Sequence, residues 1–437
     1  MSVSKNELSE LGITGCGGAG FPTHVKLAAK NIGSLIVNAA ECEPLLHKDK
    51  EILFHFTGQV FEGIKLALDM TGAEKAFLGI KKKYSSLLSH VEARCDDSRI
   101  SILRLGDFYP SGDEYELVYE ATGKLIPFGG IPLDVGCVVS NVETLLNVYR
   151  QKPFIKKFIT INGAVPNPCT LEVPIGTSVK EALAWAGVAD LTGKVIIDGG
   201  PMMGKIISPD AIVSKTCSGL LVFPEKHPFL RKMLRTPIQN RSIARSSCDQ
   251  CTDCTELCPR HLLGYPISPH KSMRTAQLSV FNSNSFSRDS IFCCECGLCS
   301  LFACPEDLPP REIAVMAKAT HLADGVKQKD WPGKPSVHPM RQFRRVSIHQ
   351  LVKRLGLTEF EQDAPYTSSG PEIRRVKLPL KMHIGAPAVP VVKTGDSVIA
   401  GQMIADIPRG KLGAALHASL SGRIESVDSD SIIISAV

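Results

Sequence analysis

Two cysteine runs carry the clearest chemical pattern in the chain. The first is Cys248-x2-Cys251-x2-Cys254-x3-Cys258-Pro259, and the second is Cys293-x2-Cys296-x2-Cys299-x4-Cys304-Pro305. The first spacing is that of bacterial ferredoxins, and the second has one extra residue before its last cysteine. Three thiolates on a tight loop can hold three corners of a [4Fe–4S] cubane, so the fourth ligand must come from elsewhere. The spacing predicts two iron–sulfur clusters, which carry electrons rather than hydrolyse a substrate.

The ligands of each cluster follow from two-cluster ferredoxins, where the last cysteine of each run binds the other cluster. We expect one cluster on Cys248, Cys251, Cys254 and Cys304, and the second on Cys293, Cys296, Cys299 and Cys258. Cys294 is a ninth cysteine of this region and is not expected to be a ligand. Paired zinc knuckles are the alternative, but they need two cysteine pairs rather than a triplet and one more residue.

A glycine-rich segment near the start of the chain could hold a phosphate. It reads Gly15-Cys16-Gly17-Gly18-Ala19-Gly20-Phe21-Pro22-Thr23. Its Gly-x-Gly-x-x-Gly spacing matches the dinucleotide fingerprint, with Glu41 at about the distance of the ribose-binding acid. A Rossmann glycine loop follows a buried strand, however, whereas residues 2–12 are polar and helix-like. We favour a loop whose bare amides, with the next helix and Lys26, cradle a phosphate. A Rossmann site and a plain tight turn are the alternatives.

Two acids follow a predicted strand, in the segment Asn38-Ala39-Ala40-Glu41-Cys42-Glu43-Pro44. Ligands of α/β sheets bind at the carboxyl ends of the strands. Glu41 and Glu43 could therefore hydrogen-bond a ring or a sugar. The alternative for such acids is a solvated loop.

The elements that would position these residues alternate between strands and helices. Residues 34–40 predict a buried strand, preceded by a short helix over residues 25–31. Helical apolar spacing marks residues 60–70 and 81–93, and residues 76–80 predict a second strand. The alternation is typical of a layered α/β domain, which we place at residues 1–150.

Three further modules are expected after this domain. Residues 155–205 have a β-grasp-like pattern of strands around one helix, with Ser178 as its N-cap. Residues 206–244 would link it to a cysteine-bearing, helical domain at 245–320. Residues 371–437 have short apolar runs broken by Gly and Pro, typical of a small all-β sandwich or barrel. Residues 321–370 would be mostly a connector, with Arg341, Arg344 and Arg345 on a solvated face.

Composition excludes several classes of protein. The chain has 437 residues, of which 43% are hydrophobic and 22% charged, as expected for two to four soluble domains. No run of about 18 apolar residues occurs, and the polar N-terminus is no secretory signal. The net charge of +6 has no long basic block, which argues against nucleic acid as a partner. Nine of the 15 cysteines lie between Cys248 and Cys304, which favours metal binding over disulfides in a cytoplasmic protein.

Several segments together resemble a family of flavoproteins. GCGGAGFPTHVK and VNAAECEPLLHKDK are similar to the flavin-binding subunit of respiratory complex I, and closer to the C subunit of Rnf complexes. Residues 109–114 and 140–145 match further segments of these proteins, and residues 155–205 resemble their soluble-ligand-binding β-grasp domain. The C-terminal module resembles the barrel-sandwich hybrid domain that Rnf C subunits carry at the N-terminus. Here the module lies at the C-terminal end of the chain. This domain order and the residues of the cysteine runs most resemble the cobalamin reductases of propanediol-utilisation microcompartments.

The resemblance implies a multidomain α/β protein whose N-terminal domain holds FMN non-covalently. The glycine loop (Gly15, Gly17, Gly18, Gly20) and Lys26 would bind the phosphate side of FMN. Asn38, Glu41 and Glu43 would face the ribityl chain and the ring, and Asn141 and Thr144 would complete the pocket. Phe21, Asp113 and Glu114 map near the NADH site. Ala40 departs from complex I, which has an Asp at this position, although Rnf-type proteins also lack it.

The implied activity is that of an NADH-dependent cobalamin reductase. Electrons would pass from NADH through FMN and the two [4Fe–4S] clusters to cobalamin, and an adenosyltransferase would then restore the cofactor of a diol dehydratase. The protein would work inside a bacterial microcompartment, beside shell proteins. One alternative is an Rnf-type subunit that passes electrons between NADH and a ferredoxin or membrane complex. The other is a cluster-bearing scaffold without catalysis. The Asp-x-His-x-x-Gly motif of base-off cobalamin proteins is absent. His383 and His417 are lone histidines and are expected to be structural or at the surface.

Overall fold

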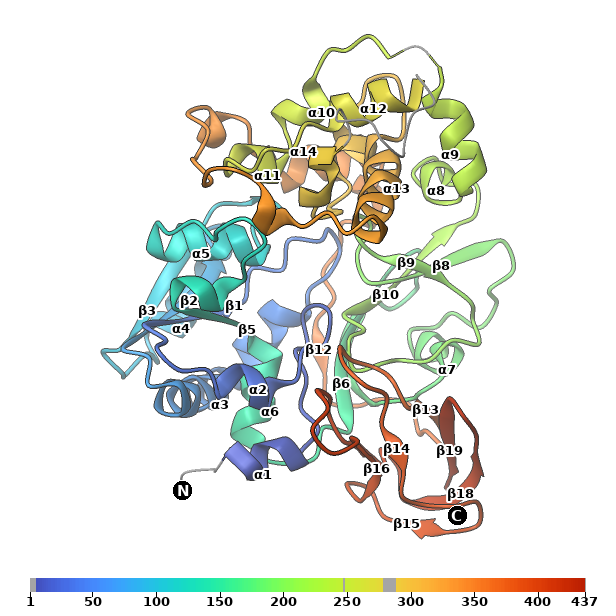
Figure 1. Ribbon diagram of the computed structural model, residues 1–437. Helices are drawn as coiled ribbons and strands as arrows, with labels where there is room; N and C mark the ends of the chain where they lie inside the picture. The colour runs from blue at the N-terminus through green and yellow to red at the C-terminus, as the bar shows by residue number, and fades with distance from the viewer. Residues whose placement is uncertain (1–4, 247, 278–287, 437) are drawn as a thin grey trace.

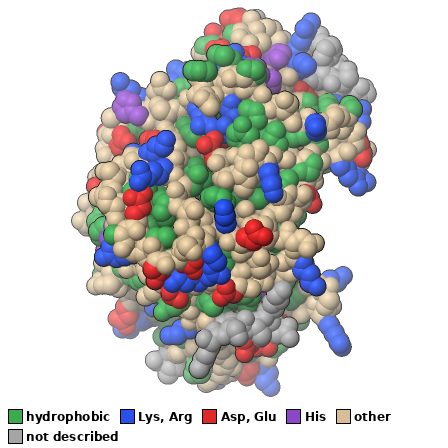
Figure 2. Space-filling model, turned by 90° about the vertical axis from the view of Figure 1, so that its left-hand side faces the viewer, with side chains coloured by type: hydrophobic (Ala, Val, Ile, Leu, Met, Phe, Trp, Pro, Cys, Tyr) green, Lys and Arg blue, Asp and Glu red, His purple; other side chains and the backbone are tan. Residues whose placement is uncertain are grey.

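The computed structural model describes residues 5–246, 248–277 and 288–436. Figure 1 shows the N-terminal α/β domain on the left, a second sheet and a C-terminal β module on the right, and the cysteine region above them. None of the described helices combines the length and the apolar character needed to cross a membrane. On the face shown in Figure 2, basic and acidic side chains lie intermixed rather than in one field of a single charge.

A parallel four-stranded sheet organises the N-terminal domain, in the order β3-β2-β1-β5. Its central strand β1 pairs in register with both neighbours, so that Asn38 lies beside Gly79 and Asn141 at the carboxyl edge. Helices cover this parallel sheet, so its strands are buried, which is consistent with their apolar sequences. The elements are α1 (Lys5–Glu10), α2 (Thr23–Leu27), β1 (Ser34–Asn38), α3 (Lys48–Thr71), β2 (Lys75–Lys81), α4 (Ser85–Glu92), β3 (Ile100–Leu105), β4 (Phe108–Tyr109), α5 (Glu114–Thr122), β5 (Cys137–Asn141) and α6 (Val142–Arg150).

The predicted elements of this domain are present, with shifted bounds. The helix expected at 60–70 is the second half of α3, which begins at Lys48. The helix expected at 81–93 begins at Ser85, because Lys81 belongs to β2. The glycine loop lies between α1 and α2 and follows no strand of the sheet. This placement removes the Rossmann alternative, in which the loop must follow the first strand.

The second sheet is mixed and six-stranded, in the order β12-β7-β6-β10-β8-β9. It contains more of the chain than the sequence predicts. Strand β10 lies in the segment expected to be a linker, yet it pairs in parallel with β6 and antiparallel with β8. Strand β12, from the expected connector, extends the sheet beside β7. The elements are β6 (Lys156–Gly163), β7 (Cys169–Pro174), α7 (Val179–Trp185), β8 (Lys194–Asp198), β9 (Lys205–Ile207), β10 (Gly219–Pro224) and β12 (Tyr366–Thr367).

The cysteine region consists of short helices, as predicted. Its cysteine loops adopt positive φ angles at Gln250, Thr252, Glu295 and Gly297, which turn the backbone sharply between successive cysteines. All 15 cysteines are free thiols, so no disulfide contributes to the described part of this region. The elements are α8 (Leu230–Met233), α9 (Pro237–Ala244), α10 (Asp253–Glu256), α11 (Pro259–Leu262), α12 (Pro269–Gln277), η2 (Arg288–Phe292), η3 (Cys299–Ala303) and α13 (Pro310–Ala323).

The expectation of a connector with a solvated arginine face at residues 321–370 is wrong. Helix α14 (Ile348–Leu355) buries its apolar face in a core shared with the cysteine region, and β11 (Val346–Ser347) pairs with β4. Arg341 is only 4% exposed and forms ion pairs with Glu116 and Glu120 of α5. Arg345 also pairs with Glu120, so these arginines fasten the segment to the N-terminal domain.

The C-terminal module is all-β, as predicted, with one sheet in the order β13-β19-β18-β15 and another in the order β14-β16-β17. It packs tightly on the N-terminal domain: a Cβ on Gly12 would lie 2.3 Å from the carbonyl oxygen of Ala415. His383 and His417 are buried in this module and therefore structural rather than surface residues. The elements are β13 (Arg375–Pro379), β14 (Val389–Pro390), β15 (Ser397–Val398), β16 (Met403–Asp406), β17 (Leu416–His417), β18 (Gly422–Val427) and β19 (Ser431–Ser435).

Lys215 joins three modules. Because it is buried, we expect it to make the folding stability depend on pH. Its Nζ donates to the carbonyl oxygens of Gly12 (2.7 Å) and Ala415 (3.0 Å), and its side chain is 1% exposed. Burial lowers its pKa from the ordinary value of 10.5 to about 7. Between pH 7 and 10 the unfolded chain therefore binds a proton that the folded chain does not. Stability should rise with pH across this range, by at most about 1.4 kcal/mol per pH unit.

The measurement is the Tm from pH 7 to 9.5 for the native chain and for Lys215→Met. The variant has no amine to titrate, so its Tm should rise less with pH than that of the native chain. Equal pH slopes in the two proteins would contradict a neutral Lys215 in the folded state.

Candidate functional site

The glycine loop is a closed loop with an exposed tip. Its ends are joined by a hydrogen bond from the amide of Gly15 to the carbonyl of Phe21 (2.9 Å). Cys16 is buried, and its amide donates to Oγ1 of Thr144 at 3.0 Å, which ties the loop to the start of α6. Gly17, Gly18 and Ala19 stay exposed at the tip. The tip thus presents backbone amides next to the carboxyl edge of the sheet, as a phosphate cradle requires.

Glycine is needed in this loop for two physical reasons. A Cβ on Gly17 would lie 3.1–3.2 Å from the side-chain atoms of Asn141, whereas one on Gly18 would meet nothing within 4 Å. Gly20 has a φ of +73°, which a side chain strains, and its Cβ would approach Thr216 and His383. The loop is therefore fitted between Asn141 and the C-terminal module, with open space over Gly18.

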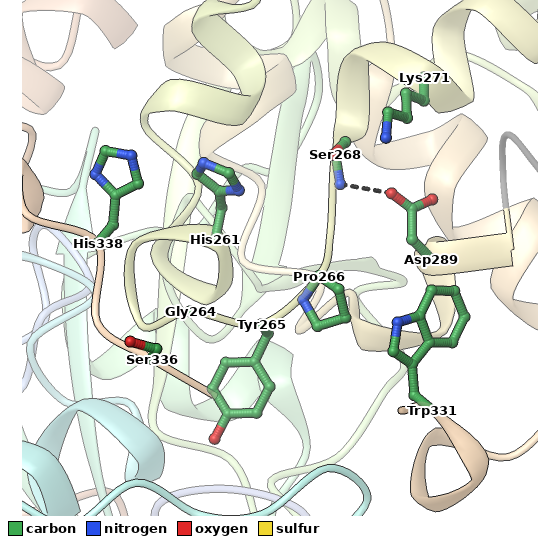
Figure 3. A pocket seen from close by; sticks show the side chains of 10 residues that line it. All are labelled: His261, Gly264, Tyr265, Pro266, Ser268, Lys271, Asp289, Trp331, Ser336 and His338. Carbon is green, nitrogen blue, oxygen red and sulfur yellow. Dashed lines mark hydrogen bonds between the residues drawn. The ribbon is translucent and has the colours of Figure 1, made fainter. Parts of the chain in front are cut away.

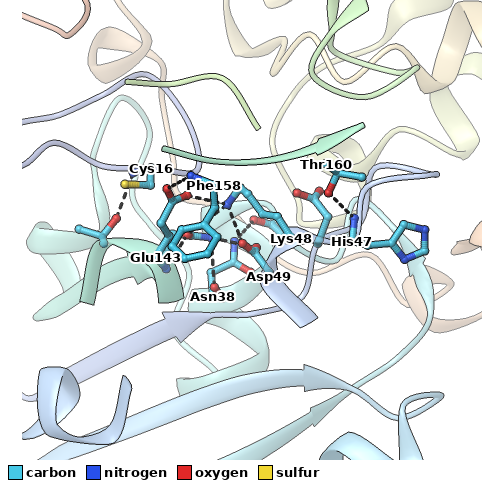
Figure 4. A network of polar contacts seen from close by, with 12 residues as sticks. Cys16, Asn38, His47, Lys48, Asp49, Glu143, Phe158 and Thr160 are labelled. Atoms are coloured by element: carbon cyan, nitrogen blue, oxygen red, sulfur yellow. Dashed lines mark hydrogen bonds and ion pairs between the residues drawn. The ribbon is translucent and has the colours of Figure 1, made fainter. Parts of the chain in front are cut away.

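A buried polar network lies at this edge (Figure 4). Lys48 donates to Oδ1 of Asp49 at 2.6 Å and lies 3.2 Å from Oε2 of Glu143, which also pairs with Lys157. Asn141 donates from Nδ2 to Oδ2 of Asp49 at 2.9 Å. All four charged side chains are at most 3% exposed, and the two positive and two negative charges balance. The network fixes the orientation of Asn141, one of the predicted FMN residues.

The sequence analysis missed Lys48, Asp49 and Lys157. Lysine and aspartate are almost never fully buried, so their residue types alone point to the surface. The only available signal was position: Lys48 and Asp49 belong to the segment that resembles the flavoproteins.

The predicted residues of the strand end lie together, with their polar groups oriented by backbone. Asn38 donates from Nδ2 to the carbonyl of Gly112 (3.0 Å) and accepts at Oδ1 from the amide of Ala40 (3.0 Å). Glu41 accepts from the amide of Glu43 at 3.1 Å. Burial, and next the charge of Asp49, raise the pKa of Glu41 above its usual range. Asn38 and Glu41 therefore lie at the same edge as Asn141 and the glycine loop.

Two other predicted cofactor residues hold neighbouring modules in place. The carboxylate of Glu43 accepts the amides of Met202 and Met203, each at 2.9 Å, in the turn between β8 and β9. Asp113 caps α5 by accepting from the amide of Tyr115, and it also pairs with both Nη atoms of Arg260 at 2.6 and 3.0 Å. Their roles toward flavin and NADH stay predictions, but each carboxylate already has protein partners.

The remaining predicted cofactor residues surround the glycine loop. Lys26 donates to the carbonyl of Val139 (2.8 Å) and lies 3.6 Å from Glu114. Its Nζ lies 6.0 Å from the centre of the Phe21 ring. Phe21, Lys26 and Glu114 therefore form one partly exposed group beside the loop, where an aromatic ring and a carboxylate could meet a dinucleotide.

The structure brings the cysteines of each predicted quartet near one another. After burial, the groups that raise the pKa of Cys254 to about 12 are Cys248, Cys304 and Cys251, in that order. Burial and then Cys293 and Cys258 likewise raise the pKa of Cys299. The other quartet lines one small cavity, whose lining includes Cys258, Cys293, Cys294, Cys296 and Cys299. The last cysteine of each run thus lies near the other run, as the predicted exchange of ligands requires, and Cys294 lies beside the second quartet. The ligand sets themselves stay predictions.

The donor set suits iron–sulfur clusters. Each predicted set consists of three cysteines of one run and the last cysteine of the other, which is the ligand set of a [4Fe–4S] cluster in two-cluster ferredoxins. Amide donors also approach the sulfurs: the backbone N–H of Glu295 lies 3.4 Å from Sγ of Cys293, and Nε2 of Gln250 lies 3.2 Å from Sγ of Cys248. Such hydrogen bonds are among the features that set cluster potentials.

The two quartets differ in exposure and in neighbours. Cys251, in the first quartet, is the one exposed thiol of the eight, whereas Cys258 and Cys296 of the second are buried. The second quartet contacts the N-terminal domain, because the Tyr109 hydroxyl donates to the carbonyl of Cys296 at 2.7 Å. The Asp113–Arg260 pair lies at the same junction, where Arg260 follows Cys258 by two residues.

A cavity of about 360 Å³ lies among residues 261–271, Asp289 and residues 331–338. Figure 3 shows His261 and His338 on one side of it, and Asp289 with Trp331 on the other. Asp289 accepts the amide of Ser268 at 2.8 Å, and burial raises its pKa to about 7. Sequence reasoning did not identify this cavity, because its lining comes from three separate segments.

Comparison with protein families places a known domain on each module. Residues 8–150 match the Nuo51 FMN-binding domain, 158–205 the SLBB domain, 247–309 a 4Fe-4S dicluster domain, and 362–435 the RnfC barrel sandwich hybrid domain. These matches confirm a multidomain α/β chain and confirm the predictions of FMN and iron–sulfur clusters as cofactors.

Curated relatives match almost the whole chain. The cobalamin reductase PduS of Salmonella typhimurium is 38% identical over 99% of this chain and 97% of its own. The cobalamin reductase PduS of Citrobacter freundii is 38% identical over 97% of this chain and 94% of its own. A more distant relative is the RnfC-type protein of the Na⁺-translocating ferredoxin:NAD⁺ oxidoreductase complex of Acetobacterium woodii. It is 35% identical, over 59% of this chain and 58% of its own.

Proposed function

Because the chain belongs to the family of the cobalamin reductases PduS, we propose that it is an NADH-dependent flavin and iron–sulfur oxidoreductase that reduces cobalamin. The observation that supports this proposal most strongly is that three sites follow one another through direct contacts. The glycine loop and strand end of the N-terminal domain come first, the quartet of Cys258, Cys293, Cys296 and Cys299 next, and the quartet with exposed Cys251 last.

The contacts support a direction for electron flow. Tyr109, Asp113 and Arg260 join the N-terminal domain to the buried second quartet. Cys299 of the second quartet has Cys254 of the first among its electrostatic neighbours, so the quartets are adjacent. Electrons would therefore enter at the second quartet and leave at the first, which reaches the surface at Cys251.

The N-terminal residues fit FMN by their chemistry. The exposed amides of Gly17 and Gly18, with Lys26, would hold the phosphate, and Asn38, Glu41 and Asn141 would face the rest of the molecule. Thr144 fixes the loop through the amide of Cys16. Phe21 and Glu114 would meet NADH. When bound, FMN supplies the conversion of a two-electron hydride transfer into single-electron steps.

The overall reaction balances as one NADH and two cob(III)alamin giving NAD⁺, one proton and two cob(II)alamin. The reduced corrinoid would feed an adenosyltransferase, which restores the cofactor of a diol dehydratase. The PduS relationship favours a propanediol microcompartment as the site of this work, with shell proteins as neighbours.

The test is an anaerobic titration followed in the visible spectrum. NADH is added to protein loaded with FMN and reconstituted clusters, and hydroxocobalamin is added next. We expect NADH to bleach the flavin and clusters, and cobalamin to restore their colour while it is itself reduced. If cobalamin draws no electrons but a ferredoxin does, the protein acts as an Rnf-type electron carrier instead. If no FMN is retained, it is a cluster-bearing scaffold. The Rnf alternative is the less favoured, since its relative matches only 59% of the chain.

A further inference from the structure

A broad groove of about 910 Å³ lies beside the first cysteine quartet. It is formed by the segment after β10, by α8 and α9, and by the loop that follows Cys304. Its lining residues are Glu225, Lys226, His227, Arg231, Leu234, Arg235, Gln239, Ser242, Ile243 and Asp307. None of the residues predicted to hold FMN, NADH or a cluster lines it.

The groove is close to a cluster ligand. Asp307 follows Cys304 by three residues, and three residues of chain span at most about 11 Å. Ile243 packs against the core that contains Cys304, with Cys248 beside it. A molecule in the groove would therefore lie next to the first quartet, the one proposed to release electrons.

The groove carries a surplus of positive charge that is held in place. Lys232, which is 16% exposed, lies 2.8 Å from Oδ1 of Asp307 behind the groove and neutralises that carboxylate. Arg231 also reaches Oδ2 of Asp307 at 3.1 Å, and Arg235 donates to its backbone carbonyl at 2.9 Å. With Lys226 and Glu225 of the lining included, the groove and Lys232 together carry four positive and two negative charges, so a positive surplus remains. A guanidinium matches the oxygens of a phosphate with paired N–H donors.

Apolar and amide-binding groups lie near these arginines. Leu234 is 47% exposed just after α8, and Ile243 is partly buried near the end of α9. Gln239 and Ser242 supply hydrogen-bonding groups between them. The groove therefore combines an apolar face, amide partners and a phosphate site in a volume suited to a large cofactor.

We propose that this groove binds the corrinoid, with Arg231 and Arg235 on the phosphodiester of its nucleotide tail. The corrin ring carries apolar methyl groups and amide side chains, which suit Leu234, Ile243, Gln239 and Ser242. The inference rests on the proposed function, since it places the electron acceptor of that reaction. The cavity beside His261 is less suited, because its 360 Å³ is well under half the volume of the groove.

The test compares cobalamin with cobinamide, a corrinoid that lacks the nucleotide and its phosphate. In Arg231→Gln/Arg235→Gln, the Kd for cobalamin, measured by calorimetry on the oxidised protein, should rise at least about tenfold, because the variant loses both charged partners of the phosphodiester. The Kd for cobinamide should stay unchanged. The matched control is Arg374→Gln, since Arg374 is an exposed arginine of the C-terminal module with one surface ion pair.

Steady-state rates provide an independent readout. The KM for cobalamin should rise with the Kd in the double variant, while reduction of ferricyanide by NADH stays at the native rate. Equal cobalamin affinity in the native chain and the variant, or no cobalamin binding by the native chain, would overturn the inference. If the double variant reduced a ferredoxin more slowly but reduced cobalamin at the native rate, the groove would bind a protein partner, and the inference would also be overturned. If the native chain binds cobalamin in the groove but NADH does not reduce it, the proposed function fails while the binding site stands.

Discussion

Cys258→Ser is expected to lower the iron content from about eight to about four atoms per chain, because one of two [4Fe–4S] clusters loses a ligand. Cys258 lies in the first sequence run but lines the same cavity as Cys293 and Cys299 of the second. The lost cluster should therefore be the one beside the N-terminal domain. Reduction of cobalamin by NADH should fall to background, whereas bleaching of FMN by NADH should persist. Iron analysis and the anaerobic spectrum measure these two results.

Double variants identify the partners of Cys258. If Cys258 shares a cluster with Cys293, the pair Cys258→Ser/Cys293→Ser should still retain about four iron atoms. The pair Cys258→Ser/Cys248→Ser should lose nearly all iron, because it removes a ligand from each cluster. The opposite pattern would show that each run binds its own cluster. Cys294→Ser is the control and should keep both clusters, since Cys294 belongs to neither predicted quartet.

Lys48→Met is expected to destabilise the folded chain by about 3–5 kcal/mol, the usual cost of removing one partner from a buried ion pair. Lys48 is 1% exposed and is paired with both Asp49 and Glu143. Without it, Asp49 keeps Asn141 as its hydrogen-bond partner but loses its only positive neighbour within salt-bridge distance among the described residues. FMN affinity should fall as well, because Asn141 is oriented by Asp49. Thermal unfolding and FMN fluorescence measure the two effects.

Lys50→Met provides a matched control on the same helix. Lys50 is 19% exposed and pairs with Asp363, whose side chain is 85% exposed, so the loss should be under about 1 kcal/mol. A loss as small in Lys48→Met as in Lys50→Met would show that the buried network adds little stability. An unchanged FMN affinity in Lys48→Met would separate the network from the cofactor site.

Local patterns predicted part of the fold. The strands β1, β2, β6, β7 and β8 were all expected, because each is a short apolar run bounded by turn residues. Pairing between distant segments was not predictable. Strand β10 lies in an expected linker, and the two-residue strand β12 is too short to produce a periodic signal. Both join the second sheet only through partners far away in the chain.

The cysteine spacing predicts two ligand quartets, whereas no pattern in the sequence indicates the buried charges. Thiolate spacing follows the size of the cluster, so the sequence records it directly. Arg341 and Lys48 have the residue types of a solvated surface, and only their carboxylate partners, brought near by folding, make their burial possible. Asp113 and Glu43 show a related limit: the resemblance pointed to cofactors, while their nearest partners are Arg260 and the Met202–Met203 amides.

The exposed thiol of Cys251 has a consequence for the sensitivity of the protein to dioxygen. Dioxygen dissolved in the solvent should reach the first cluster before the second, because Cys251 of the first quartet is exposed, whereas none of the four cysteines of the second quartet is. Oxidative damage should therefore begin at the outlet of the electron path and leave the inner part intact. A protein damaged in this way would still consume NADH at its flavin while failing to deliver electrons. The time for which the protein keeps its electron-transfer activity would then depend on the local concentration of dioxygen.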